Sequence, residues 1–153
     1  MSHANMPALL PMTPDDLPEV IELWTVTEGV GLNESDSVPA LTVFLARNPG
    51  LSRVAREENK IVAAVLCGHD GRRGFLYHLA VAAEYRGQGL GTALVEQCLA
   101  ALAELGIQKC NALVYNHNVQ GQRFWRRLRF NARDDLGFWQ TTINDLTPIG
   151  QHP

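Results

Sequence analysis

The stretch Val81-Ala82-Ala83-Glu84-Tyr85-Arg86-Gly87-Gln88-Gly89-Leu90-Gly91-Thr92 decides the fold of this chain. It follows a run over 75–81 that predicts a β-strand, and it leads into a segment whose apolar stripe predicts a long helix. Backbone N–H groups at a helix start lack partners, and the helix dipole adds positive potential there. Glycines at alternate positions would let this backbone approach an anion closely, and Arg86 would add a cationic fork. The turn therefore favours a site for a phosphate or pyrophosphate group.

Several interpretations of this glycine-rich turn compete. A dinucleotide site requires G-x-G-x-x-G, but Thr92 stands where the third glycine would be, counted from Gly87. A nucleoside-triphosphate P-loop requires a Lys after its last glycine, and the turn contains no Lys. Glycines placed for turn geometry alone are the structural alternative, although three of them exceed what a strand-to-helix turn needs. A nucleotide-binding module of another class stays open as a hypothesis.

Outward from the turn, hydrophobic periodicity predicts strands and helices in a single domain spanning residues 1–153. Thr13 before Pro14, and Asn118 before its apolar stripe, are typical helix N-caps. The predicted fold class is α/β (α+β with a mixed sheet), in the order β-α-α-β-β-β-α-β-α-β-β. Strands are expected at residues 9–12, 51–56, 61–67, 75–81, 109–114, 131–135 and 138–143, and helices at 13–24, 39–47, 90–105 and 118–128.

Composition and charge limit the classes of protein to which the chain can belong. Hydrophobic residues make up 46% of its 153 residues and charged residues 19%, which is typical of a soluble globular domain. A net charge of −3 favours neither nucleic acid nor an anionic membrane as partner, and no apolar run approaches the roughly 18 residues of a membrane span. Three widely spaced cysteines indicate reduced thiols in the cytoplasm, and their spacing predicts no metal site.

Two motifs together carry a resemblance to a known family. Arg86-Gly87-Gln88-Gly89-Leu90-Gly91 resembles the R/Q-x-x-G-x-G/A acetyl-CoA loop of the GNAT N-acetyltransferase superfamily. Downstream, the stretch 118–130 resembles that family's N-x-x-A-x-x-L/F-Y-x-x-L-G-F helix and agrees with it at Asn118, Phe124, Leu128 and Phe130. The motifs occur in the family's order and at its separation. The resemblance covers most of the chain, strongly from about residue 74 to residue 130.

The resemblance implies a GNAT-like acyl-CoA N-acyltransferase fold with acetyl-CoA as cosubstrate and no metal. The pantetheine arm would lie between the strands 75–81 and 109–114 and pair with the backbone of the first, where the N–H near Val81 could steady an oxyanion. The glycine turn would cradle the pyrophosphate. The cofactor-binding residues implied in this way are Leu79, Ala80, Val81, Arg86, Gly87, Gln88, Gly89, Leu90, Gly91, Thr92, Asn118, Phe124 and Trp125.

Acetyl transfer to an amine requires a neutral amine and a good leaving group. An alkyl amine has a pKa near ~10.4, so a base or a desolvating pocket is needed. Strand alternation predicts that Phe75, Tyr77, Leu79 and Val81 share one face, which the resemblance implies is the face that carries a base. His78, the better base by chemistry, is expected on the opposite face. Trp125 stands where many GNAT enzymes have the Tyr that protonates the thiolate, so Tyr115 or Tyr77 would substitute. Tyr77, His78 and Tyr115 are thus the candidate catalytic residues.

The function expected from the resemblance is transfer of an acetyl group from acetyl-CoA to an amine of a small molecule, amino acid or protein by direct nucleophilic attack. The alternative is a non-catalytic CoA-binding sensor or regulator on the same fold, which Trp125 favours. The acceptor pocket is expected between the loop 27–38 and the C-terminal strands, where Glu28, Glu34 and Asp36 would attract a cationic amine. Phe138 and Trp139 would line that pocket, pack the hairpin or meet a partner in a homodimer. The sequence identifies neither the acceptor nor the oligomeric state.

Overall fold

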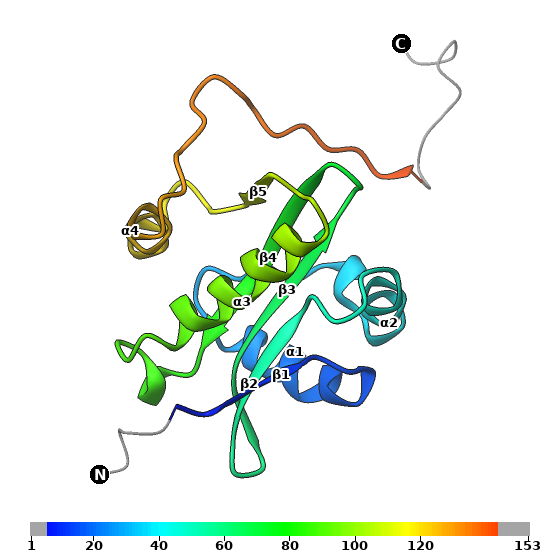
Figure 1. Cartoon of the computed structure of the whole chain (residues 1–153), viewed down its shortest axis with the longest axis vertical. Helices are drawn as coiled ribbons and strands as arrows, with labels where there is room; N and C mark the ends of the chain where they lie inside the picture. Colours follow the sequence, from blue (N-terminus) through cyan, green and yellow to red (C-terminus); the bar gives the residue numbers. More distant parts are fainter. Residues whose placement is uncertain (1–5, 144–153) are drawn as a thin grey trace.

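The computed structural model describes residues 6–143 and contains one five-stranded sheet in the order β1-β2-β3-β4-β5. The first four strands pair antiparallel, and β5 pairs parallel to β4. Figure 1 shows α3 crossing one face of this mixed sheet, with α1 and α2 on the other side. The strands are β1 (Ala8–Pro11), β2 (Arg53–Glu57), β3 (Lys60–His69), β4 (Arg73–Val81) and β5 (Lys109–Ala112). The helices are α1 (Leu17–Thr25), α2 (Val38–Arg47), α3 (Leu90–Glu104) and α4 (Val119–Arg127).

Two apolar cores lie on opposite faces of the sheet because β3 is buried on both sides, from Ile61 to Gly68. One core joins the sheet to α3 through side chains such as Leu76 and Leu94. The other joins it to α1 and α2 and contains Trp24, whose side chain is fully buried. Burying one large side chain contributes about 1.5–3 kcal/mol, so each helix is held chiefly by its apolar stripe. Within residues 6–143, no helix is long and apolar enough to cross a membrane.

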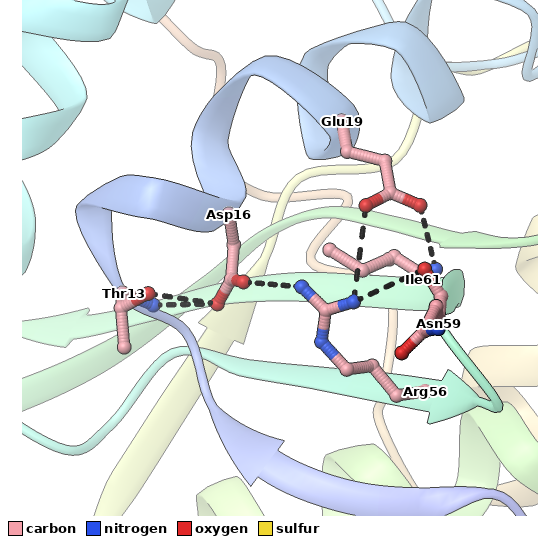
Figure 2. Close-up of polar contacts among 6 residues, drawn as sticks. All are labelled: Thr13, Asp16, Glu19, Arg56, Asn59 and Ile61. Carbon is pink, nitrogen blue, oxygen red and sulfur yellow. Dashed lines mark hydrogen bonds and ion pairs between the residues drawn. The ribbon is translucent and has the colours of Figure 1, made fainter.

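A buried ion pair fastens the start of α1 to the β2–β3 hairpin (Figure 2). The Asp16 carboxylate accepts the Thr13 N–H at 2.8 Å through Oδ2, and its Oδ1 lies 2.7 Å from an Arg56 guanidinium nitrogen. Glu19 adds a second link by accepting the Ile61 N–H at 2.7 Å. Burial by itself would raise the pKa of Asp16, but the hydrogen bonds from Thr13 and Arg56 outweigh it and lower the pKa below its ordinary value of 3.8. The carboxylate therefore remains ionised and keeps its partners.

A β-bulge in β4 overturns the predicted alternation of its side chains. Ala80 pairs with Ala64, while Tyr77 pairs with Leu66, so three steps along β4 match two along β3. The extra residue lets His78 adopt a left-handed φ of 58°. The predicted face shared by Phe75, Tyr77, Leu79 and Val81 is therefore wrong: Tyr77 packs with Ala80 against the core of α1 and α2, whereas Leu79 and Val81 pack with Leu76 against the core of α3.

The parallel pairing between β4 and β5 is short. It begins at Arg73 with Lys109 and ends at Leu76 with Ala112. The expected strand 109–114 is thus two residues too long, and β4 from residue 77 to residue 81 has no ladder with β5. In the described part of the chain, these last β4 residues keep one edge free for another extended group.

The two expected C-terminal strands are absent from the structure. Residues 131–143 contain neither strand nor ladder, and every residue between 131 and 143 is exposed. Figure 1 shows this segment leaving α4 and running apart from the sheet. A local ion pair forms near the beginning of this segment. Arg133 Nε and one terminal guanidinium nitrogen donate to the Asp135 carboxylate at 2.9 and 2.8 Å. Apolar residues such as Phe138 and Trp139 suggested strands, but an extended segment becomes a strand only where a neighbour pairs with its backbone.

Candidate active site

The predicted turn before α3 has the geometry of an anion cradle. Gly87 and Gly89 have φ values of 75° and 83°, a left-handed conformation that residues with a Cβ adopt at a cost. The space beside them is open, since a Cβ added at either position would meet no atom within 4 Å. Gly89 is the N-cap of α3, whose 15 residues present their dipole to this space.

The backbone donors of this turn are available. Among the described residues, no backbone acceptor bonds the N–H groups of residues 87–92; the first bonded one is Ala93, which donates to Gly89 at 3.0 Å. Arg86 folds back and donates its Nε–H to the Val81 carbonyl at 2.9 Å, which holds its guanidinium at the rim of the turn. Unpaired donors, a helix start and a cation are the groups that a pyrophosphate such as that of acetyl-CoA requires. Of the sequence-predicted cofactor residues, Leu90 is buried in the core and would contribute through its backbone alone.

The second motif forms α4 and packs against the turn. Asn118 caps the helix by accepting the Gly121 N–H at 2.9 Å, as its position predicts. A Cβ added at Gly91 would lie 3.4 Å from the Phe124 ring, so the beginning of α3 meets the middle of α4 through these two residues. Trp125 packs edge-to-face on Phe124, with ring centroids 5.1 Å apart. The two matched motifs therefore lie side by side.

The end of α4 explains how Arg129 can stand where the motif of the family has a glycine. The Phe130 N–H donates to the Trp125 carbonyl at 2.9 Å and the Arg129 N–H donates to the Arg126 carbonyl at 2.9 Å, which is a Schellman cap. Such a cap needs a left-handed residue, and Arg129 fills the position with a φ of 70°. The packing of Trp125 on Phe130, with ring centroids 4.9 Å apart, supports the cap in place of glycine.

The bulge in β4 brings His78 to a buried carboxylate. His78 Nε2 lies 3.0 Å from Asp36 Oδ1, and the relative exposures of the two side chains are 19% and 8%. The imidazole also packs edge-to-face on Trp24 of α1, with ring centroids 5.0 Å apart. The expectation that His78 lies on the face opposite Tyr77 is therefore wrong, because the extra residue of the bulge turns it toward α1 and α2 as well.

Of the three acidic residues expected to attract a cationic amine, Glu28 and Glu34 are exposed, whereas Asp36 is buried. Asp36 ends the 3-10 turn Glu34–Asp36, where its Oδ2 accepts the Asn33 N–H at 3.1 Å. The signal that would have found it is Asn33-x-x-Asp36 just before a helix. Thr13-x-x-Asp16 is the same pattern, and it was interpreted as a helix start.

The other two candidate catalytic residues lie elsewhere. Tyr77 packs between Phe44 and Phe75 in a pocket of about 290 Å³. Burial, with Asp70 nearby, raises the pKa of the Tyr77 phenol above its ordinary value of 10.0, so Tyr77 stays protonated and is excluded as a base. Tyr115 is half-exposed, stacks on His117 and lies close to Gly31, where an added Cβ would meet the Tyr115 hydroxyl and displace it.

The loop between α1 and α2 also approaches α4. A Cβ added at Gly29 would lie 2.8 Å from the Asn118 amide nitrogen, and Gly29 itself has a φ of 89°. Glycine is required here because both the close approach and the backbone conformation exclude a side chain. The loop that leads to Asp36 thus contacts Asn118, the N-cap residue of α4.

The cysteines supply no reactive thiol to this arrangement. All three are free, and burial raises the pKa of the Cys110 thiol to about 12. Hydrogen bonding with Cys98, together with burial, raises the pKa of Cys67 as well. Within residues 6–143, no three His, Cys, Asp or Glu side chains gather as a metal ion would require.

Comparisons with known proteins agree with this geometry. The profile of the acetyltransferase (GNAT) family matches residues 17–130. An acetyltransferase of Yersinia pestis (strain Pestoides F) is 32% identical over 133 residues, covering 86% of this chain and 92% of that protein. The PaiA N-acetyltransferase of Thermoplasma acidophilum, solved in complex with coenzyme A, has a TM-score of 0.74 at 19% identity, covering 85% of this chain and 92% of that chain.

A second solved structure shows the same fold. The aminoglycoside 6′-N-acetyltransferase of Acinetobacter haemolyticus has a TM-score of 0.72 at 18% identity, covering 89% of this chain and 99% of that chain. The family match begins at α1 and ends at Phe130, so it includes the anion cradle, the bulge with His78 and the capped α4. By its sequence, its sheet and its glycine cradle, the chain belongs to the GNAT family of acetyltransferases.

Proposed function

We propose that this acetyltransferase transfers the acetyl group of acetyl-CoA to a primary amine by direct attack, with His78 as the general base. The observation that carries the proposal is the His78–Asp36 pair of 3.0 Å in the β4 bulge. That bulge lies where β4 has lost its β5 partner and has a free edge. An extended pantetheine arm pairing with this edge would bring its thioester next to the imidazole.

Asp36 would orient the base. Its Oδ1 accepts from His78 Nε2–H, so the neutral imidazole has an unprotonated Nδ1. Among the described residues His78 Nδ1 has no hydrogen-bond partner, which leaves it able to accept a proton from the attacking amine. This division of roles, a base held in one tautomer by a buried carboxylate, is the general-base arrangement of other acyl-transfer enzymes.

The proposed step balances without a further reactant. The amine nitrogen forms a bond to the carbonyl carbon, the carbon–sulfur bond breaks, and the sulfur leaves with the electron pair. His78 Nδ1 takes the proton that the amine loses. A thiol with a pKa near ~8.5 leaves tolerably as an anion, so Trp125 in place of a phenol is compatible with turnover. Tyr77, which stays protonated, and Tyr115 stay predictions as donors to the leaving thiolate.

The experiment is thiol release from acetyl-CoA by the full chain over a panel of amines, for the wild type, His78→Gln and Asp36→Asn. Asp15→Asn is the control, because the Asp15 carboxylate is exposed and lies just before α1. We expect kcat to fall about 10²–10⁴-fold in His78→Gln, the range for losing a general base, while coenzyme A affinity measured by calorimetry is unchanged. Turnover by His78→Gln at the wild-type rate would contradict the assignment. Coenzyme A binding without turnover of any amine would favour the sensor function instead.

A further inference from the structure

We propose that the pocket between α2 and β4 binds the body of the acceptor, and that the acceptor is a primary amine carrying an aromatic ring. This inference rests on the proposed function, since it assumes that the amine reaches His78. The pocket has a volume of about 290 Å³, which suits one ring with a short chain. Its lining includes Phe44, Phe75, Tyr77, Arg47 and Asp70.

The pocket lies on the same face of the sheet as His78. Tyr77 and His78 are neighbours in the bulge, and both face α1 and α2. The separation of Phe75 and His78 along β4 sets the length of the site. Phe75 is three residues before His78, and a strand rises about 3.3 Å per residue. Phe75 is therefore about 10 Å along β4 from the proposed base, a span that an arylethylamine would cover with its amine one hydrogen bond of about 3 Å from that base.

Three aromatic side chains give the pocket its specificity. The Phe75 and Tyr77 rings are stacked with an interplanar angle of 10°, and Phe44 meets Tyr77 edge-on with ring centroids 6.3 Å apart. These rings are half-buried. Faces and edges of aromatic rings favour another flat ring over a saturated group of equal size by about 0.5–1.5 kcal/mol per pair, or roughly two- to tenfold in affinity.

The floor and the mouth of the pocket complete the argument. A Cβ added at Gly68 would lie 2.8 Å from the Phe44 ring, so the glycine on β3 lets this ring pack directly on the sheet as the floor of the pocket. At the mouth, the exposed Arg47 has no ion pair within 4.0 Å among the described residues. Asp70 is held ionised by the Arg73 and Arg72 N–H groups, whose hydrogen bonds lower its pKa. Opposite charges at the solvent end favour a ring with a hydrogen-bonding substituent, such as a phenol.

The test compares tyramine with 2-cyclohexylethylamine, hexylamine and spermidine at saturating acetyl-CoA. We expect the KM for tyramine to be at least threefold below that for 2-cyclohexylethylamine, its saturated counterpart. Phe44→Ala should raise the KM for tyramine about tenfold and change kcat less than twofold, because the ring lies away from the reacting atoms. Phe44→Leu is the milder variant if Phe44→Ala unfolds, and Val43→Ala, an exposed neighbour on α2, is the matched control.

Direct binding of tyramine to the coenzyme A complex, followed by calorimetry, separates this inference from the proposed function. Tyramine binding that Phe44→Ala weakens, without turnover of any amine, would support the pocket and overturn the function. Equal KM values for tyramine and 2-cyclohexylethylamine, or preferred turnover of spermidine, would overturn the pocket while leaving the function intact. Absence of both binding and turnover would overturn both.

Discussion

Asp16 and Asp36 are built in the same way at two places in the molecule. Each ends a three-residue 3-10 turn just before a helix, and each is buried, at 7% and 9% exposure. Each Oδ2 accepts a backbone N–H from three residues earlier, at 2.8 and 3.1 Å. Each Oδ1 meets a nitrogen side chain from the sheet, at 2.7 and 3.0 Å. The two carboxylates are therefore held by the same arrangement of hydrogen bonds.

The partners of the two carboxylates differ, and with them the consequences. Arg56 keeps its charge at all accessible pH values, and it lies on the hairpin strand β2, beside a register shift against β3, where Glu19 also contacts it. His78 can gain and lose a proton, and it lies in a bulge with a left-handed backbone, beside the free edge of β4. The comparison teaches that one capping pattern can hold a permanent cation or a titratable imidazole, depending on the side chain opposite.

The largest effect expected from breaking this comparison is on catalysis. Asp36→Asn should lower kcat about 10–100-fold, because the amide no longer holds His78 in one tautomer. Asp16→Asn should leave kcat per folded molecule within about twofold, since Asp16 lies with the hairpin. Steady-state kinetics across pH 5–9 with both variants checks this, and an equal loss of kcat in both would show that the pairs do not differ in role.

The next effect concerns stability and has the opposite order. Asp16→Asn should cost about 2 kcal/mol in the free energy of unfolding, because it leaves the Arg56 guanidinium with a weaker partner at a partly buried site. Asp36→Asn should cost about 1 kcal/mol, since the amide can still accept the Asn33 N–H. Urea titrations measure both values. A larger loss in Asp36→Asn would mean that the His78 pair is the main structural tie.

A pH titration sharpens the stability difference. The pKa of Asp16 is lower in the folded chain than its ordinary value of 3.8, so the carboxylate stabilises the fold above that pH. The contribution is lost as pH falls through the folded-state pKa. We therefore expect the stability gap between the wild type and Asp16→Asn to be constant from about pH 7 to pH 5 and to shrink below pH 4. A gap that widens toward acid would contradict the assigned direction of the pKa shift.

The smallest expected effect tests the guanidinium fork of Arg56. Its two terminal nitrogens divide between Asp16 at 2.7 Å and the Asn59 carbonyl with Glu19. Arg56→Lys keeps the charge and loses this division, so it should cost about 1 kcal/mol and leave acetyl transfer unchanged. Thermal unfolding compares it with the wild type, and Arg123→Lys, at an exposed position of α4, serves as the control. No difference between the two variants would show that charge alone fastens the hairpin.

The sequence predicted most of the fold because most elements carry local signals. The glycine turn, the Asn118 cap and the hairpin between β2 and β3 form as their residues indicate. The expected strands at 131–135 and 138–143 failed because strand formation depends on a pairing neighbour, which alternation cannot reveal. The predicted faces of β4 were wrong for a related reason. One inserted residue reverses the faces of all residues after it, and no residue in the run 75–81 indicates a bulge.

The candidate site was predicted unevenly for the same physical reason. The cofactor side is read from contiguous motifs, whose backbone geometry is set by glycines and a helix start. The acceptor side depends on contacts between residues 42 positions apart, such as His78 and Asp36, and on the phase that the bulge imposes. Side-chain chemistry indicated His78 as the better candidate base. Strand alternation placed it on the face opposite Tyr77, whereas both lie on the side of α1 and α2.

The contacts of Gly29 with Asn118 and of Gly31 with Tyr115 tie the loop that leads to Asp36 to the segment that begins α4. A displacement of α4 would therefore be passed to the loop through these contacts. Occupancy of the anion cradle should then change the affinity for the acceptor, and by thermodynamic reciprocity the acceptor should change the affinity for the coenzyme by the same factor. We expect the dissociation constant of each substrate to change when the other is bound.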